Sequence, residues 1–204
     1  MLPITMKLKN KKCIVIGGGK VAFRRIQTLL AEGANVTVIS PELLPNLINL
    51  VEEQCIEWLK RPFADGDCVD AFLIIAATND KSINERVANL CHPNQLVNIV
   101  DNPEKSNVYF PAVGRKGLLS IAVSTEGASP MLAKHVRDRV MEQFDDEFEA
   151  YIAFVKETRE LILSMELEER KKQILLNELI DHRLLSKGEQ IQFLSRIHEL
   201  PITY

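Results

Sequence analysis

Short apolar runs alternate with stretches of helical spacing along the first hundred residues of the chain. The apolar runs predict β-strands at 13–16, 35–39, 56–59, 71–77 and 96–100. Between them, apolar residues three and four positions apart predict helices at 20–32 and 80–91. The run 71–77, AFLIIAA, is apolar at every position, as in a central parallel strand covered on both faces. Alternating strands and helices predict an α/β fold with a Rossmann-type, doubly wound parallel sheet.

The pattern changes in the second half of the chain. Two further apolar runs, 108–113 and 118–124, flank the glycine-bounded turn GRKG and predict paired strands. Ser129 stands where it would cap a helix beginning at Pro130, and helices are expected from there to the end, interrupted near Gly188. A four-residue recurrence predicts one buried helical stripe made of Val136, Val140, Phe144, Phe148 and Ile152.

Composition excludes several classes of protein. The net charge of −3 argues against a general nucleic-acid binder. No apolar run reaches the roughly 18 residues of a membrane span, and charges interrupt the N-terminus too early for a signal peptide. The four cysteines form no CxxC pair and the four histidines form no HxxxH pair. We therefore expect reduced thiols in a cytoplasmic protein and no metal site.

The glycine-rich segment at residues 17–22 contains G-x-G-x-x-A between a predicted strand and a predicted helix. In a dinucleotide-binding loop, the first glycine permits a tight turn and the second lets the backbone approach a pyrophosphate. Ala22 would let helix and strand pack closely, and the phosphates would face unpaired N–H groups at the helix start. A glycine-rich turn without a ligand is the alternative. The cofactor-binding candidates here are Gly17, Gly18, Gly19, Lys20 and Val21.

The second predicted strand lacks the acidic residue that usually accepts a hydrogen bond from the adenosine ribose. It ends in Ser40, followed by Pro41 and Glu42, and no arginine stands there to bind a 2′-phosphate. Ser40 could hydrogen-bond a ribose hydroxyl, and Glu42 could reach it. The sequence therefore favours NAD over NADP.

Polar residues follow two other predicted strands, where ligands bind in such folds. Thr78 follows the central strand and is a further cofactor-binding candidate, whereas Asp80 nearby could equally cap a helix. Asp101, in NIVDNP, follows the strand at 96–100. It is either a turn residue or a catalytic one.

Residues 111–140 carry a local excess of positive charge. Five basic residues against Glu126 and Asp138 give +3 in a chain of −3. Such a field favours an anionic ligand, with a solvated face of mixed charge as the alternative. The basic residues are Arg115, Lys116, Lys134, Arg137 and Arg139.

Four segments together resemble one known family. CIVIGGGKVAFRR, AATND, NIVDNP and FPAVGRKGLLSIAVSTEGASPMLAKHVR stand in the order and spacing of the siroheme synthase N-terminal domain family, whose stand-alone bacterial form is precorrin-2 dehydrogenase. The resemblance covers residues 2–139; from residue 141 onward it extends only to a helical pattern. With no methyltransferase domain expected, the chain is not predicted to perform the whole siroheme pathway.

The resemblance implies oxidation of precorrin-2 to sirohydrochlorin, with loss of two electrons and two protons and with NAD as hydride acceptor. It places the catalytic aspartate on Asp101 and the family's serine-glycine loop on 124–130. Ser124, Gly127 and Ser129 would then line the substrate cleft, although Ser129 is as readily a helix cap. The eight carboxylates of precorrin-2 suit the positive stretch, which adds Arg115 to the substrate-binding candidates.

The resemblance also implies a homodimer formed through the middle of the chain, where the edge of the predicted hairpin could be covered by a second copy. We therefore expect an NAD-binding domain at 1–110, a dimerisation and substrate-cleft region at 111–145, and a helical C-terminal domain at 146–204. The family usually has glycine where this chain has Glu126. A carboxylate there would repel an anionic substrate, so Glu126 is expected to point away.

Two alternative functions stay open at this point. Some family members also insert iron into sirohydrochlorin. Asp101 could then also take the pyrrole protons, and His135 could assist. The chain could instead be a non-catalytic NAD-sensing regulatory domain, which needs the glycine loop but no substrate cleft. We expect dehydrogenase activity alone, with a separate chelatase as partner.

Overall fold

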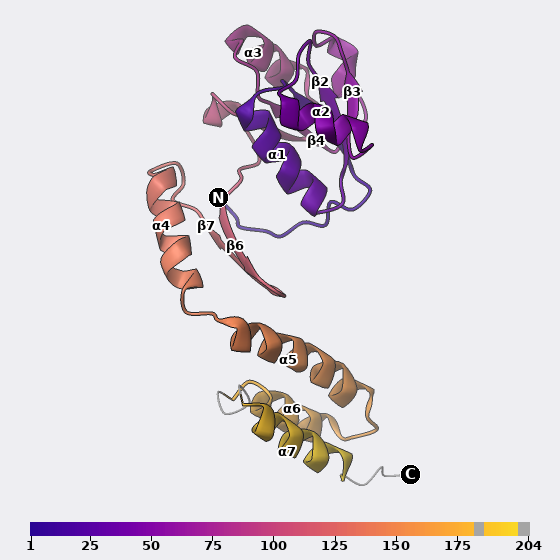
Figure 1. Ribbon diagram of the computed structural model, residues 1–204, viewed down its shortest axis with the longest axis vertical. Coiled ribbons are helices and arrows are strands. Elements are labelled where there is room, and N and C mark those ends of the chain that lie inside the picture. The colour runs from indigo at the N-terminus through magenta and orange to yellow at the C-terminus, as the bar shows by residue number, and fades with distance from the viewer. Residues whose placement is uncertain (182–185, 200–204) are drawn as a thin grey trace. The chain divides into compact units, whose positions relative to one another are not determined.

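The computed structural model describes residues 1–181 and 186–199 and divides the chain into two compact units, 1–110 and 111–204. The first unit is an α/β domain, and the second joins a β-hairpin to helices (Figure 1). No helix among the described residues is long and apolar enough to cross a membrane.

The first unit is built on five parallel strands in the order β3-β2-β1-β4-β5. The strands are β1 (Lys12–Ile16), β2 (Asn35–Ile39), β3 (Glu57–Leu59), β4 (Leu73–Ala76) and β5 (Leu96–Ile99). All four residues of β4 are buried, as expected for a central strand covered on both faces. The predicted Rossmann-type parallel sheet is confirmed.

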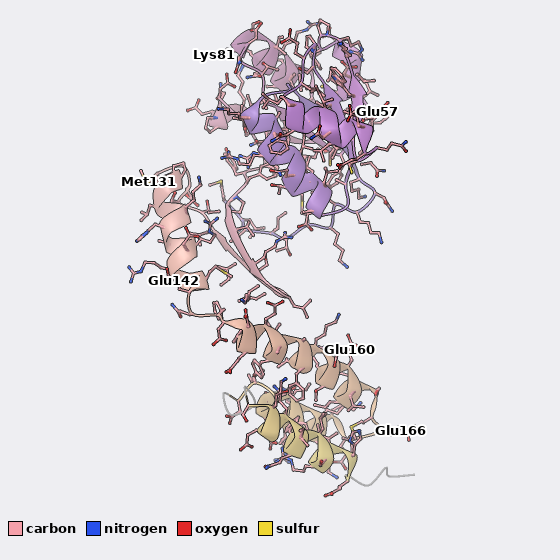
Figure 2. All side chains as sticks on the ribbon, in the orientation of Figure 1. Glu57, Lys81, Met131, Glu142, Glu160 and Glu166 are labelled. Carbon is pink, nitrogen blue, oxygen red and sulfur yellow. The ribbon has the colours of Figure 1, made fainter. Side chains whose placement is uncertain are left out.

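Helices cover both faces of this sheet. Apolar side chains of α1 (Lys20–Ala31) and α2 (Pro45–Glu52) share one core with alternate residues of β1, β2 and β4. On the opposite face, α3 (Lys81–Leu90) and the 3₁₀ turn η1 (Asp65–Cys68) pack against the other residues of β1 and β4. Lys81, labelled in Figure 2, marks the start of α3. A second 3₁₀ turn, η2 (Pro103–Lys105), follows β5.

The second unit begins with the antiparallel hairpin of β6 (Ala112–Lys116) and β7 (Leu119–Val123). Helix α4 (Pro130–Met141) packs closely on it. The missing side chain of Gly114 permits this packing, since a Cβ there would lie only 2.4 Å from Cγ of Met141. Met131 and Glu142, labelled in Figure 2, are the second residue and the C-cap residue of this helix. Helices α5 (Asp146–Ser164), α6 (Glu169–Glu178) and α7 (Lys187–His198) share a further core of Tyr151, Ile162, Leu175, Leu179, Phe193 and Ile197.

Several predicted elements were wrong in position. Helix α2 was not predicted at all, and the first hairpin strand was predicted four residues too early, at 108 instead of 112. The expected break in the helices near Gly188 is confirmed, since α6 ends at Glu178 and α7 begins at Lys187, one residue before Gly188. Residues 182–185 and 200–204 of the predicted C-terminal domain lie outside the described residues.

The predicted buried stripe from Val136 to Ile152 was also wrong. The chain leaves the helical path between α4 and α5, where Asp145 accepts a hydrogen bond from N–H of Phe148 at 2.9 Å and caps α5. Val136 is 37% exposed. A helix cap inside the predicted stripe changes the direction of the chain, so a four-residue spacing across it no longer marks one face.

Candidate active site

The N-terminal end of α1 presents unpaired main-chain donors. Gly19 is the N-cap residue, no side chain caps the helix, and no acidic residue lies in its first turn. The N–H groups of Lys20 and Val21 have no acceptor in the part of the chain that the structure describes. A Cβ built on Gly19 would meet no atom within 4 Å, so the space in front of the loop is open. This arrangement fits the diphosphate of a dinucleotide.

Gly17 and Gly18 are required by the packing of the protein itself. A Cβ on Gly17 would lie 2.4 Å from the main-chain oxygen of Ala77, and its φ of 115° favours glycine. A Cβ on Gly18 would lie 2.1 Å from the main-chain oxygen of Glu42. These two glycines let the loop lie directly against the chain that follows β4 and β2, whereas Gly19 faces open space.

The segment after β2 is ordered by a buried serine. Ser40 is 9% exposed, and its Oγ donates to the main-chain oxygen of Glu42 at 2.7 Å. The Ser40 main-chain oxygen accepts from Nε1 of Trp58 at 2.9 Å. Pro41 and Glu42 are exposed beside the Gly18 backbone. Ribose contacts from Ser40, Pro41 and Glu42 stay a prediction, with Ser40 shaping the turn that carries the exposed carboxylate.

Thr78 and Asp101 are joined through one buried side chain. Oγ1 of Thr78 donates to Oδ1 of Asn84 at 2.8 Å, and Nδ2 of Asn84 donates to Oδ1 of Asp101 at 3.0 Å. Asn84 belongs to α3 and is 1% exposed, whereas Asp101 is exposed to solvent. The polar residues that follow β4 and β5, two neighbouring strands, are therefore held together at the carboxyl edge of the sheet, where ligands bind in this fold.

Sequence reasoning missed Asn84. Its signal was available, because it shares a helix face with Ile83 and Val87, and a polar residue among apolar ones marks a buried hydrogen-bonding group.

Asp80 has the simpler of its two expected roles. Its Oδ1 accepts from N–H of Ser82 at 2.8 Å and of Ile83 at 3.4 Å, so the helix cap is confirmed. The hydrogen bonds from Ser82 hold the pKa of Asp80 below its usual range.

In the second unit, the serine-glycine loop is closed by its own hydrogen bonds. Oγ1 of Thr125 donates to the main-chain oxygen of Ser129 at 3.0 Å. Oγ of Ser129 accepts from N–H of Leu132 at 3.1 Å, which confirms the helix cap. Oγ of Ser124 accepts from N–H of Glu126 at 3.3 Å. Both hydroxyls keep a proton to donate, and a Cβ on Gly127 would meet no atom within 4 Å.

The positive charge of this region is partly neutralised within the unit. Lys116 pairs with Asp146, and Arg137 pairs with Asp138 at 2.6 Å. Lys134 and Arg139 make no ion pair with any residue in the two described ranges. Arg115 lies exposed in β6, opposite Ser120. Substrate contacts from Arg115, and from Ser124, Gly127 and Ser129, stay predictions.

Three family models match successive parts of the chain. The model described as "Putative NAD(P)-binding" matches residues 4–112, "Sirohaem biosynthesis protein central" matches 116–143, and "SirC C-terminal domain" matches 148–193.

The chain is 40% identical to the precorrin-2 dehydrogenase of Bacillus subtilis (strain 168) over 74% of its length and 94% of that protein. It is 32% identical to the precorrin-2 dehydrogenase of Priestia megaterium, over 98% of this chain and 99% of the relative. The chain belongs to the precorrin-2 dehydrogenase family. The solved structure of "SirC, precorrin-2 dehydrogenase" superposes with a TM-score of 0.87 at 32% identity, covering 98% of this chain and 100% of that one.

Longer members of the wider family contain this region as a part. The siroheme synthase of Thioalkalivibrio sulfidiphilus (strain HL-EbGR7) is 42% identical over 68% of this chain but over 28% of its own length. The resemblance to this family seen in the sequence motifs is confirmed, and the match extends through the helical C-terminal part, beyond residue 139.

Proposed function

We propose that this precorrin-2 dehydrogenase family member oxidises precorrin-2 to sirohydrochlorin with NAD in siroheme biosynthesis. The observation that carries the proposal is the near full-length match to precorrin-2 dehydrogenases, in sequence and in fold. The open, uncapped start of α1 and the exposed carboxylate of Asp101 at the carboxyl edge of the same sheet support it. NAD, when bound, supplies the two-electron acceptor.

Residues of the first unit would hold the dinucleotide by its charged and polar groups. The N–H groups of Lys20 and Val21 would donate to the diphosphate, and the missing side chain of Gly19 leaves room for it. The exposed carboxylate of Glu42 would accept from a ribose hydroxyl. An acidic group there repels a 2′-phosphate, and no basic residue lies between Ser40 and Leu59, which supports NAD over NADP.

Asp101 would act as the general base. Oxidation removes two electrons and one proton from the macrocycle as a hydride, together with a second proton. A carboxylate is ordinarily ionised at neutral pH and can accept that second proton, so charge does not build up on the ring. Because Asp101 is exposed, it can release the proton to water and return to the ionised form.

Replacing Asp101 tests this assignment. The D101N variant keeps the shape of the side chain but removes the base, so NADH formation from precorrin-2 under anaerobic conditions should fall by roughly 100-fold or more. NAD binding, followed by fluorescence titration, should stay within a factor of about two. Wild-type turnover in D101N would remove Asp101 from the role. If wild-type protein binds NAD but never precorrin-2, a sensing domain replaces the enzyme.

The proposal includes a homodimer that works in the cytoplasm beside a separate chelatase. Both edges of the two-stranded β6–β7 sheet lack a partner strand among the described residues, and α4 exposes Met131 (79%) and Leu132 (51%). A second copy covering this face would bury apolar surface and pair the sheet. Metal insertion into purified sirohydrochlorin without NAD would instead make the protein bifunctional.

A further inference from the structure

Asn84 is a buried polar side chain with every hydrogen-bonding position filled. Its Nδ2 donates to the main-chain oxygen of Thr78 at 3.1 Å and to Oδ1 of Asp101 at 3.0 Å. Its Oδ1 accepts from N–H of Thr78 at 3.3 Å and from Oγ1 of Thr78 at 2.8 Å, whose one proton it shares with the main-chain oxygen of Asp80 at 2.9 Å. An amide has two donors and two acceptor positions, so the set is complete.

The orientation of this amide is determined by the main chain. The N–H group of Thr78 can only donate and its carbonyl oxygen can only accept, and both contact Asn84. Oδ1 must therefore face the N–H group and Nδ2 must face the carbonyl. The remaining hydrogen of Nδ2 is consequently committed to the carboxylate of Asp101.

We propose that Asn84 is a positioning residue for the dehydrogenation, holding Asp101 by one carboxylate oxygen so that the other is free to take the proton. The inference rests on the proposed function, in which Asp101 is the base. Oδ2 of Asp101 makes no hydrogen bond to any residue in 1–181 or 186–199. An exposed carboxylate without such an anchor samples several rotamers, and a misplaced base loses rate without losing affinity.

The same side chain connects the base to the cofactor-binding candidate Thr78. Thr78 follows β4 and Asp101 follows β5, and Asn84 reaches both from α3. One rigid amide thus fixes the distance between the ends of β4 and β5, which carry the cofactor-binding candidate and the base. Because Asn84 is 1% exposed, water cannot substitute for it without a rearrangement of α3.

The nearby charged side chains of α3 and η2 have other partners. Asp80 caps α3, and Lys105 of η2 pairs with Glu85 of α3 at 2.5 Å. Glu104 is exposed in η2. None of these groups makes a hydrogen bond to Asp101 among the described residues, so Asn84 is the donor to test.

The experiment compares N84A, N84D and the control N98A with the wild type in anaerobic turnover of precorrin-2. Asn98 is also a buried asparagine at this sheet, 6% exposed, but its Nδ2 donates to the main-chain oxygen of Val108. N84A should lower kcat by roughly 10- to 100-fold, the effect of losing one hydrogen bond to a charged group, with KM for precorrin-2 within about threefold. N98A should have a lower melting temperature than the wild type but a kcat within about threefold of it.

The pH dependence gives a readout that stability alone does not move. In N84D a carboxyl replaces the donor next to Asp101, and two carboxyl groups in contact oppose ionisation. The acid limb of the kcat profile should therefore move to higher pH in N84D but not in N98A. Equal loss of kcat in N84A and N98A, in proportion to their melting temperatures, would overturn the proposal, as would full activity of N84A.

Crystal structures of wild type and N84A separate this inference from the function on which it rests. The carboxylate of Asp101 should leave its wild-type position in N84A whether or not Asp101 is the base. An unmoved carboxylate overturns the positioning role even if turnover is confirmed. Full activity of D101N together with a displaced carboxylate in N84A would instead contradict the assignment of the base.

Discussion

Three adjacent glycines differ in what their missing side chains allow. Gly17 and Gly18 lie against main-chain oxygens of the protein, at 2.4 and 2.1 Å from a hypothetical Cβ. Gly19 has no atom within 4 Å of that position. A substitution at Gly18 should therefore act on folding, whereas one at Gly19 should act on the ligand.

The pair G18A and G19A tests this difference. G18A forces the loop away from Glu42 and should lose roughly 1–3 kcal/mol of unfolding free energy, measured by urea denaturation. The free energy of unfolding of G19A should stay within about 0.5 kcal/mol of wild type, since Gly19 has φ of −92°, which alanine tolerates. Its Kd for NAD should rise about tenfold or more, because the added methyl occupies the space in front of free N–H groups. Unchanged NAD affinity in G19A would place the diphosphate elsewhere.

Single residues with a local signal were predictable, and those defined by distant contacts were not. Ser129 followed by Pro130 is a helix start that sequence alone specifies, and the structure has it. The link from Asn84 to Asp101 spans 17 positions and depends on the packing of α3, which no local pattern contains. Glu126 has φ of 51°, a conformation that favours glycine, so the usual family residue at this position has a physical reason.

At the scale of elements, the turn η1 is closed by one carboxylate. Asp67 accepts from N–H of Ala64 and from Nη1 of Arg61, both at 2.8 Å. The hydrogen bonds from Arg61 are the main reason why the pKa of Asp67 lies below its usual range, against an opposing effect of burial. A lowered pKa in the folded state stabilises the fold above the unfolded pKa, and this contribution is lost as pH falls through the folded value.

D67N should consequently lower the melting temperature by a few degrees at pH 7, and the difference from wild type should shrink as pH falls below about 4. Thermal scans at pH 7 and about pH 3 measure it. D70N is the matched control: Asp70 has φ of 61°, which asparagine adopts readily, so its melting temperature should match wild type at both pH values. A D67N difference that grows in acid would contradict the lowered pKa.

Strong periodicity allowed most elements of the first unit to be predicted, and short or bent ones were missed. The strands β1, β2 and β5 end within one residue of their predicted limits. Helix α2 has eight residues and one buried side chain, Leu47, too few for a recognisable face. In the second unit, β6 and β7 alternate between exposed and half-buried positions, so their patterning leaves the strand limits weakly specified.

At the scale of the whole molecule, the family was readable from the sequence because four motifs agree in order. The order of the strands and the faces covered by helices required the structure, since both depend on contacts between distant segments. The division of the chain at residue 110 coincides with a change from parallel to antiparallel pairing. The expected three-part organisation stays a prediction.

The proposed dimer can be tested on the exposed face of α4. Leu132 and Val136 line a surface cavity of about 460 Å³ there, and Leu132 is 51% exposed. L132E would place a charge in the buried interface and should shift the protein from dimer to monomer in light scattering. The control I191E changes an apolar residue of α7 that is 66% exposed, and should stay a dimer. A wild-type monomer at micromolar concentration would exclude the dimer.

Helices α5, α6 and α7 share one apolar core, and every member of it among the described residues belongs to this segment. The residues between α4 and α5 connect this module to the rest of the second unit, and the Lys116–Asp146 ion pair also links α5 to β6. Gene fusion or recombination there would exchange one C-terminal appendage for another without opening either neighbouring interior. Chain ends of different lengths and architectures are thus compatible with the same oxidising machinery upstream.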